Sequence, residues 1–415
     1  MERKISVTPI WLLVEPTFYP HSEGYLRAIL EDEEIRKGFE IVYVYGETGT
    51  KSDEVIDKLH SEFEEMLTPV KVKLKDDQRL GNTVSVLVRT WKVMKVANTL
   101  SRQYGAKLIS ILRADDFIRL LAVPGVSIFF PDVRGRVTGV FFNSRCFREN
   151  SFPLNILASA VCRVLQSGYF KKMLFLDHGV CEKVTGKLDS DNSNVVGKAI
   201  DPWTSEPETK QQEAVIEDHK TTLLTFGAHS GRKGTVSLLR MFRDYAEELA
   251  DYRLVIAGPI RDDIRDEFES LIAEIDNSDR KIECVSKYIS DNDSWSYFRR
   301  SQIVLCPYVN FHGSSNVIIR ATAVGVPVVA PSFGFLGEVV EQNKIGATYQ
   351  SQDPAAILEA IFIVEKMLVS DSKLVRSNCI KYANQHSAAC YAHSLISPFR
   401  EESSEADSAC YLCSS

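Results

Sequence analysis

Short apolar segments of strand length alternate with longer segments of helical periodicity, and this alternation limits the fold more than any other feature of the sequence. In the first half, apolar runs such as WLLVEP (11–16) have hydrophobic residues at successive positions, which is typical of strands buried on both faces. The expected strands of this half are 11–16, 40–46, 107–112 and 126–133, and the expected helices are 23–38, 52–67 and 84–105. Such alternation predicts a parallel sheet covered by helices.

A polar, acidic segment, TSEPETKQQEAVIEDHK (204–220), interrupts the alternation near the middle of the chain. After it, strands are expected at 222–227, 253–258, 281–285 and 302–308, with helices at 235–250 and 263–275. We therefore predict an α/β protein with two Rossmann-like domains facing a cleft. Its parts are a first domain (1–205), a linker (206–220), a second domain (221–380), a C-terminal helix that packs back on the first domain (381–400) and a flexible tail (401–415).

Composition excludes several functional classes. The 415 residues contain 49 Lys and Arg against 56 Asp and Glu, and the net charge of -7 provides no broad cationic surface for nucleic acid. The first apolar run is interrupted by Glu15 and Pro16, and no segment reaches the roughly 20 apolar residues of a membrane span. We expect a cytoplasmic protein.

The nine cysteines do not form a recognisable framework. Most lie in apolar runs, as Cys162 and Cys306 do, which suits reduced thiols in a core. Cys410 and Cys413 form a C-x-x-C pair near the end of the chain, but no further ligand lies close in the sequence. We expect no metal site.

Two turns in the second half contain residue types that suit a phosphate. FGAHSGRKG (226–234) leaves a strand through glycines and enters a helix beside Lys233. HGSSN (312–316) places small residues with good N-cap side chains before the next helix. Backbone N–H groups at helix starts bind anions, so the two turns together could hold a diphosphate. The alternatives are a glycine turn with a solvated lysine and a helix that is simply well capped.

The order of these segments resembles the second half of the GT-B glycosyltransferases of family 4, or group 1. The resemblance rests on Lys233 with Gly234, LVIAG (254–258), GSSNVIIRATAVGVPVV (313–329) and EVVEQNKIG (338–346). It covers about 222–363, while the first half agrees only in outline. The resemblance implies two Rossmann-like domains and a nucleotide-diphosphate sugar bound to the second. It also implies transfer with retention of anomeric configuration, without a metal ion or other cofactor, to a glycan, lipid-linked or small-molecule acceptor.

The sequence departs from the family at acidic positions. The family has two glutamates separated by seven residues, and these positions hold His312 and Arg320 here. Arginine only donates hydrogen bonds, so Arg320 cannot accept from ribose hydroxyls; it would pair with a phosphate or turn outward. The family also has an arginine directly after the glycine that ends the strand. Here Ala228 follows Gly227 at that position, and Arg232 in the same loop could take the place of the arginine.

The candidate residues follow from the two turns and the resemblance. The catalytic candidates are Lys233, Arg232 and His312, and the donor-binding candidates are Gly227, Gly313, Ser314, Ser315, Asn316, Arg320 and Tyr288. On the acceptor side they are His21 and Gly24 in a first loop, and Asp115 and Asp116 after a strand. The two aspartates could equally cap the helix that follows them.

Three alternatives stay open. The loss of both glutamates favours a non-catalytic relative that binds a sugar nucleotide or a partner subunit. A sugar-nucleotide epimerase would need an acid and base pair, which the sequence does not display. The segment SGYFKKMLFL (167–176) could rest on a membrane surface, or it could be a buried junction between a helix and a strand. The sequence does not identify the sugar, the nucleotide or the acceptor.

Overall fold

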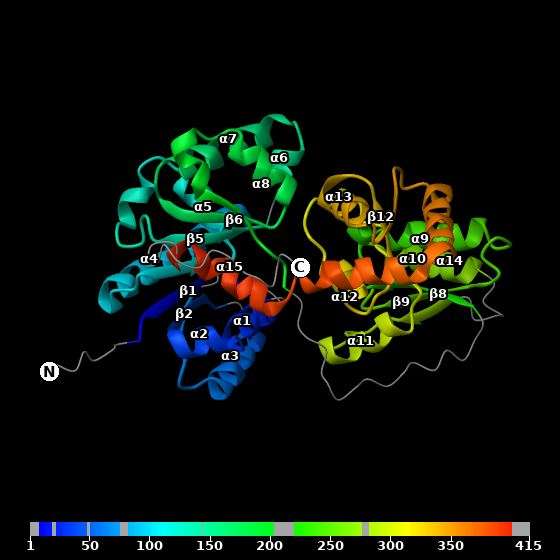
Figure 1. Ribbon diagram of the computed structural model, residues 1–415, viewed down its shortest axis with the longest axis horizontal. Helices are drawn as coiled ribbons and strands as arrows, with labels where there is room; N and C mark the ends of the chain where they lie inside the picture. Colours follow the sequence, from blue (N-terminus) through cyan, green and yellow to red (C-terminus); the bar gives the residue numbers. More distant parts are fainter. Residues whose placement is uncertain are drawn as a thin grey trace. The chain divides into compact units, whose positions relative to one another are not determined.

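The computed structural model describes residues 8–18, 22–47, 50–74, 82–142, 144–202, 220–275 and 282–400. The chain forms two compact units, one made of residues 1–204 and 388–415 and the other of residues 205–387 (Figure 1). His21, most of the expected linker, and the tail with Cys410 and Cys413 lie outside the described residues.

The first unit is built on a parallel sheet of seven strands in the order β3-β2-β1-β4-β5-β6-β7. Trp11 of the central strand aligns with Ile41 on one side and Leu108 on the other. The strands are β1 (Ile10–Glu15), β2 (Glu40–Gly46), β3 (Leu67–Val72), β4 (Leu108–Ile111), β5 (Val137–Phe141), β6 (Phe170–Phe175) and β7 (Val196–Lys198). Because helices cover both faces of the sheet, the inner strands β1, β2 and β4 are buried at successive positions, as the sequence predicts.

Two hydrophobic clusters hold the helices of the first unit against this sheet. One cluster contains side chains of α4, α5 and α7, and the other contains side chains of α1, α3 and α15. The helices are α1 (Ser22–Leu30), α2 (Glu33–Gly38), α3 (Thr50–Glu62), α4 (Asn82–Tyr104), α5 (Asp115–Leu121), α6 (Arg145–Arg148), α7 (Phe152–Gln166), α8 (His178–Thr185) and α15 (Ala388–Arg400), with 3-10 turns η1 (Val126–Phe129) and η2 (Ser190–Val195).

The chain returns to the first unit after completing the second. Tyr391, Leu395 and Ile396 of α15 are fully buried, in the same cluster as Leu26 and Ile29 of α1. Side chains far apart in the sequence therefore share one core, and α15 is part of the first unit.

The second unit has a parallel sheet of six strands in the order β10-β9-β8-β11-β12-β13. Its strands are β8 (Thr221–Phe226), β9 (Tyr252–Ala257), β10 (Ile282–Val285), β11 (Ile303–Leu305), β12 (Val328–Pro331) and β13 (Gly346–Tyr349). Its helices are α9 (Thr235–Asp244), α10 (Arg265–Glu274), α11 (Asp291–Arg299), α12 (Asn316–Ala323), α13 (Gly334–Asn343) and α14 (Pro354–Asn384), with the 3-10 turn η4 (Gly231–Lys233).

The predicted strand at 126–133 is wrong. Residues Val126–Phe129 form η1, and the strand of this region is β5, at Val137–Phe141. Gly125 precedes η1 with a φ of 81°, and Pro131 follows it without a backbone N–H to donate, so the apolar run cannot join the sheet. The side chains of Ile128 and Phe129 remain exposed as a result.

The single helix predicted at 23–38 is two helices. Asp32 separates them because its carboxylate accepts hydrogen bonds from the backbone N–H groups of Glu34 and Ile35, which begins α2. The helix expected over 52–67 ends at Glu62, and Leu67 already belongs to β3.

The segment 167–176 is not a membrane-binding segment. Phe170–Phe175 forms β6, which is hydrogen-bonded between β5 and β7, and Phe170, Met173, Leu174 and Phe175 are buried. The alternative of a buried junction between a helix and a strand is what the structure shows. Within the described part of the chain, no helix is both long enough and apolar enough to cross a bilayer.

Glu15 provides a test of the buried core of the first unit. It lies at the carboxyl end of β1, is 4% exposed, and accepts hydrogen bonds from Ser22 Oγ and from Tyr43 Oη, the latter at 2.5 Å. Burial raises the pKa of Glu15 to about 7, against the opposing effect of these hydrogen bonds. Above about pH 4.5 the unfolded state releases a proton that the folded state keeps until about pH 7. The free energy of unfolding therefore falls as pH rises from 4.5 toward 7.

The variant Glu15→Gln should remove this pH dependence. Between pH 5 and pH 8 the free energy of unfolding of the wild type should fall relative to that of the variant by about 2–4 kcal/mol. Urea unfolding of both proteins at the two pH values measures the difference. Identical pH dependence in both proteins would show that Glu15 is ionised at neutral pH in the folded state.

Candidate functional site

Strands β8 and β11 lie side by side in the second sheet, and the chain leaves them in opposite directions. From β8 it continues to β9 and β10, and from β11 to β12 and β13. In open α/β sheets, ligands bind outside the carboxyl ends of the strands at such a switch point. The loops that follow the two strands meet there, because the backbone N–H of Val309 donates to the carbonyl oxygen of Arg232 at 2.9 Å.

Glycine allows the two loops to approach this closely. Gly234 has a φ of 67°, and a Cβ at this position would lie 1.8 Å from the carbonyl oxygen of Pro307. A side chain would therefore push the β8 loop away from the β11 loop. Gly227, at the end of β8, also has a positive φ, of 107°, and its hydrogen faces the end of the Lys233 side chain.

Lys233 lies inside the site, so its interpretation as a solvated lysine is wrong. The residue is 9% exposed. Its Nζ donates to Tyr308 Oη at 2.8 Å and to the carbonyl oxygen of Phe226 at 3.4 Å. The same Nζ lies 4.3 Å from the centre of the Tyr308 ring. Burial lowers the pKa of Lys233 to about 8, with a further lowering by Arg232 and an opposing effect of Cys306. One of its three N–H donors is left for a ligand.

Tyr308 joins the two loops, and the sequence did not single it out. Its hydroxyl contacts Lys233 Nζ and, at 2.9 Å, Ser315 Oγ, and the residue is almost completely buried. The sequence does contain an indication of this role. Tyr308 ends the buried run that begins with β11, and a side chain with a polar tip at that position reaches the carboxyl edge of the sheet.

The helices that follow β8, β11 and β12 start at this edge of the sheet without a side-chain cap. They are α9 after β8, α12 after β11 and α13 after β12, and their N-cap residues are Gly234, Ser315 and Phe333. Ser315 is a good capping residue type, but its hydroxyl is hydrogen-bonded to Tyr308. Gly313 and Ser314 complete the turn before α12. Uncapped helix N-termini of this kind favour a negatively charged ligand.

Arg232 and His312 lie at the border of this region. The guanidinium carbon of Arg232 is 4.7 Å from the centre of the Phe311 ring, and the residue is exposed. The His312 ring is 5.8 Å from the ring of Phe333, and Gly334 begins α13 beside it. Both side chains are thus next to the uncapped helix starts.

Arg320 is buried and does not turn outward. It is 9% exposed, its Nε donates to Asn316 Oδ1 at 2.7 Å and its Nη1 to Ser294 Oγ at 2.8 Å. Its guanidinium carbon lies 5.8 Å from the ring centre of Trp295 in α11. The structure therefore assigns Arg320 and the side chain of Asn316 to the packing of α12 against α11.

Tyr288 is the remaining donor-binding candidate, and His229 is a histidine in the loop that follows β8. Tyr288 follows the edge strand β10, which β9 separates from β8, and its side chain is 80% exposed. His229 is fully buried, and its Nδ1 is 2.7 Å from Thr235 Oγ1. Burial, followed by the charge of Lys233, lowers the pKa of His229 to about 4, so this histidine is neutral at pH 7.

The acceptor-side candidates have structural partners. Gly24 lies in the first turn of α1 rather than in a loop. Asp115 begins α5, is buried, and accepts from the backbone N–H of Phe142 at 3.1 Å, while Asp116 forms an ion pair with Arg119 at 3.2 Å. Among the residues that the structure describes, no three His, Cys, Asp or Glu side chains gather in a way that could hold a metal ion.

Comparison with known proteins identifies the second unit more closely than the first. Residues 206–386 match the family described as glycosyl transferases group 1. No curated protein sequence matches the chain significantly.

Several solved structures share the fold over nearly the whole chain. The N-terminal domain of Candida albicans trehalose-6-phosphate phosphatase has a TM-score of 0.71 at 11% identity, with 97% of this chain and 99% of that chain covered. The α,α-trehalose 6-phosphate synthase of Burkholderia multivorans has a TM-score of 0.67 at 11% identity, covering 95% and 99%. Anabaena HepE in complex with UDP has a TM-score of 0.63 at 13% identity, covering 95% and 100%. The chain has the two-domain α/β fold of these GT-B proteins.

Proposed function

Because residues 206–386 match the family described as glycosyl transferases group 1, we propose that the protein transfers a sugar from a nucleoside-diphosphate sugar to an acceptor. The observation that carries the proposal is the buried Lys233 at the switch point between β8 and β11. Burying a lysine is costly, and a diphosphate would supply the negative charge that this position favours. The UDP bound by the HepE protein of the same fold supports this class of ligand.

The proposed chemistry follows from where charge develops during the reaction. When the bond between the anomeric carbon and the phosphate oxygen breaks, its electron pair leaves with the diphosphate, and preorganised donors stabilise that charge. In this proposal Lys233 Nζ and the N–H groups at the uncapped starts of α9 and α12 bind the diphosphate, and Arg232 approaches it from the border of the site. We assign His312, beside the start of α13, to the sugar. In this proposal these groups perform the reaction without a metal ion, with retention at the anomeric carbon.

Nucleoside-diphosphate binding is the first expected result. Calorimetry with UDP, GDP and ADP should give binding heat with at least one of them. A ligand at 100 times its Kd should stabilise the folded protein by about 2.7 kcal/mol, visible as a rise in melting temperature. The absence of both heat and melting shift with all three at millimolar concentration would remove the donor-site assignment.

The identity of the transferred sugar and the stereochemistry need a second measurement. With the matching sugar nucleotide and a panel of glycan, lipid-linked and small-molecule acceptors, proton NMR of the product should show the same anomeric configuration as the donor. An inverted product would contradict the retaining mechanism and leave the donor site intact.

A non-catalytic relative is the second candidate, and the position of Arg320 favours it. Both family glutamates are absent, and Arg320 donates hydrogen bonds to Asn316 and Ser294 within the second unit. This alternative predicts nucleotide binding without turnover of any sugar nucleotide, whereas the proposed transferase predicts both.

A further inference from the structure

We propose that the first unit binds the surface of anionic lipid membranes through a face formed by α4 and η1. This face, called the α4 face below, is defined by the exposed or half-buried side chains of Val84, Val88, Trp91, Lys95, Ile128 and Phe129. It is separate from the proposed donor site, and the inference does not depend on the proposed reaction.

Large apolar side chains are exposed on this face. Ile128 is 72% exposed and Phe129 56%, because both lie in the 3-10 turn η1, outside the sheet. The Phe129 ring is 5.1 Å from the ring of Trp91, which joins η1 to α4. Val84, Val88, Trp91 and Lys95 follow one another at helical spacing along one side of α4. Apolar side chains that cluster at a surface mark an interaction site more often than isolated ones do.

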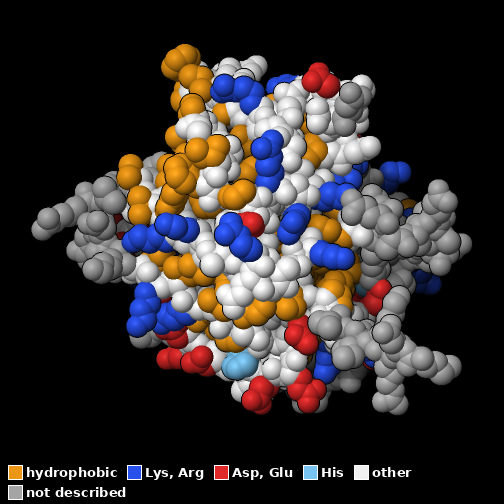
Figure 2. Space-filling model, turned by 90° about the vertical axis from the view of Figure 1, so that its left-hand side faces the viewer, with side chains coloured by type: hydrophobic (Ala, Val, Ile, Leu, Met, Phe, Trp, Pro, Cys, Tyr) orange, Lys and Arg blue, Asp and Glu red, His pale blue; other side chains and the backbone are white. Residues whose placement is uncertain are grey.

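Basic residues outnumber acidic ones around these apolar side chains. Residues 82–104 contain four basic residues, Arg89, Lys92, Lys95 and Arg102, and no acidic residue, although the whole chain has a net charge of -7. Arg102 is ion-paired with Asp132 at 2.7 Å, and Arg119, close to η1, with Asp116 at 3.2 Å, so Lys92 and Lys95 provide the cationic charge of this face. Figure 2 shows apolar and basic side chains interspersed over this side of the molecule, while acidic side chains gather toward its lower edge.

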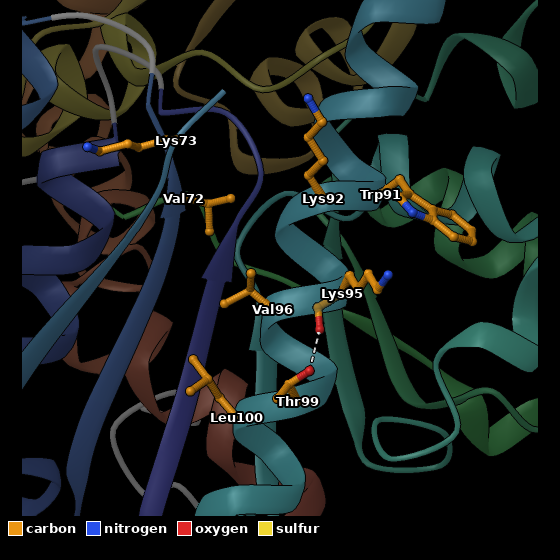
Figure 3. A pocket seen from close by; sticks show the side chains of 8 residues that line it. All are labelled: Val72, Lys73, Trp91, Lys92, Lys95, Val96, Thr99 and Leu100. Atoms are coloured by element: carbon orange, nitrogen blue, oxygen red, sulfur yellow. Dashed lines mark hydrogen bonds between the residues drawn. The ribbon is translucent and has the colours of Figure 1, made fainter. Parts of the chain in front are cut away.

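A groove between β3 and α4 extends the α4 face. It has a volume of about 600 Å³ and is lined by Val72, Lys73, Trp91, Lys92, Lys95, Val96, Thr99 and Leu100. Figure 3 shows Val72, Val96 and Leu100 facing the space between the two elements, with the lysine side chains extending outward around it. The groove therefore combines an apolar floor with ammonium groups at its border.

An anionic bilayer presents the matching chemistry at a single surface. Its phosphates attract lysine and arginine side chains, and the boundary between headgroups and acyl chains accepts apolar side chains. The opposite side of α4 is packed in the hydrophobic core through Val93, Met94 and Ala97, so the helix can lie on a membrane without leaving the fold.

Vesicle flotation tests the proposal with the full-length protein. The wild type should float with phosphatidylcholine vesicles that contain about a third phosphatidylglycerol, and not with phosphatidylcholine alone. The charge variant Lys92→Glu, Lys95→Glu and the apolar variant Ile128→Ser, Phe129→Ser should each weaken binding at least about tenfold. Added salt should weaken wild-type binding, because the attraction between charges at the surface is screened.

Matched controls separate the α4 face from general charge or hydrophobicity. Lys37→Glu, Lys183→Glu makes the same change in net charge on α2 and α8, and Val369→Ser, Leu374→Ser removes exposed apolar side chains of α14. Both controls should bind anionic vesicles as the wild type does. The proposal is overturned if the wild type does not float, which would leave the face to a protein partner, or if the variants of the α4 face and the controls bind equally.

Discussion

Replacing Lys233 with methionine is expected to weaken nucleoside-diphosphate binding by roughly 10- to 100-fold and, at neutral pH, to stabilise the folded protein. The loss of affinity is that of a charge-assisted hydrogen bond. The gain in stability arises because Lys233 is buried, whereas the sequence suggests a surface lysine that contributes little. The two effects have opposite signs, which is typical of a residue retained for binding.

The stability effect has a defined pH dependence. Burial lowers the pKa of Lys233 to about 8 from 10.5 in the unfolded chain, so the unfolded state binds more protons between these values. The cost of burying the charge is therefore fully present below pH 8 and disappears as pH rises toward 10.5. After subtracting the lost hydrogen bond to Tyr308, Lys233→Met should be more stable by about 1–2.5 kcal/mol at pH 7, with a smaller difference at pH 10.

Calorimetry and urea unfolding of the same variant measure both effects. The exposed Lys366→Met in α14 is the matched control and should change neither affinity nor stability beyond about 0.5 kcal/mol. A folded Lys233→Met protein with wild-type affinity would show that the lysine does not bind the diphosphate.

Reversing the charge of Arg320 should have the largest effect on stability. Arg320→Glu removes the hydrogen bonds to Asn316 and Ser294 and places a carboxylate beside Trp295 in a buried position. We expect the free energy of unfolding to fall by about 2–4 kcal/mol. Arg320→Gln, which keeps a neutral hydrogen-bonding group, should cost less.

The double variant His312→Glu, Arg320→Glu restores the family's acidic spacing and tests whether the site retains its ancestral form. Because α11 presents Ser294 and Trp295 to the arginine, we expect this variant to remain destabilised and not to bind nucleotides more tightly. Thermal unfolding and calorimetry give the result. A stable double variant with increased nucleotide affinity would contradict the assignment of Arg320 to the packing of α12 against α11 and would show that the acidic spacing restores a ligand contact.

The fold was predictable where local sequence determines the structure. Buried strands such as β1 and β2 are apolar at successive positions, and the turns at Gly227 and Gly234 follow the end of β8, where ligands bind in open α/β sheets. The run at 126–133 misled because its apolar residues resemble a strand, while Gly125 and Pro131 direct the backbone out of the sheet.

The details of the site depend on contacts between distant residues. Tyr308 is 75 residues from Lys233 in the sequence, and only the pairing of β8 with β11 brings them together. The direction of Arg320 likewise depends on Ser294, 26 residues away in another helix. Sequence periodicity indicates that a strand or a helix is present. It does not determine which strands pair, and therefore not which loops meet at the edge of the sheet.

The most direct test of the central claim is the pKa of Lys233 itself, measured by NMR of its side-chain Cε and Hε resonances and assigned with Lys233→Arg. In the free protein the resonances should titrate near pH 8. On saturation with the best-binding nucleoside diphosphate the pKa should rise, because the phosphate charge favours the ammonium form. An unchanged pKa in the saturated protein would contradict a diphosphate site at Lys233.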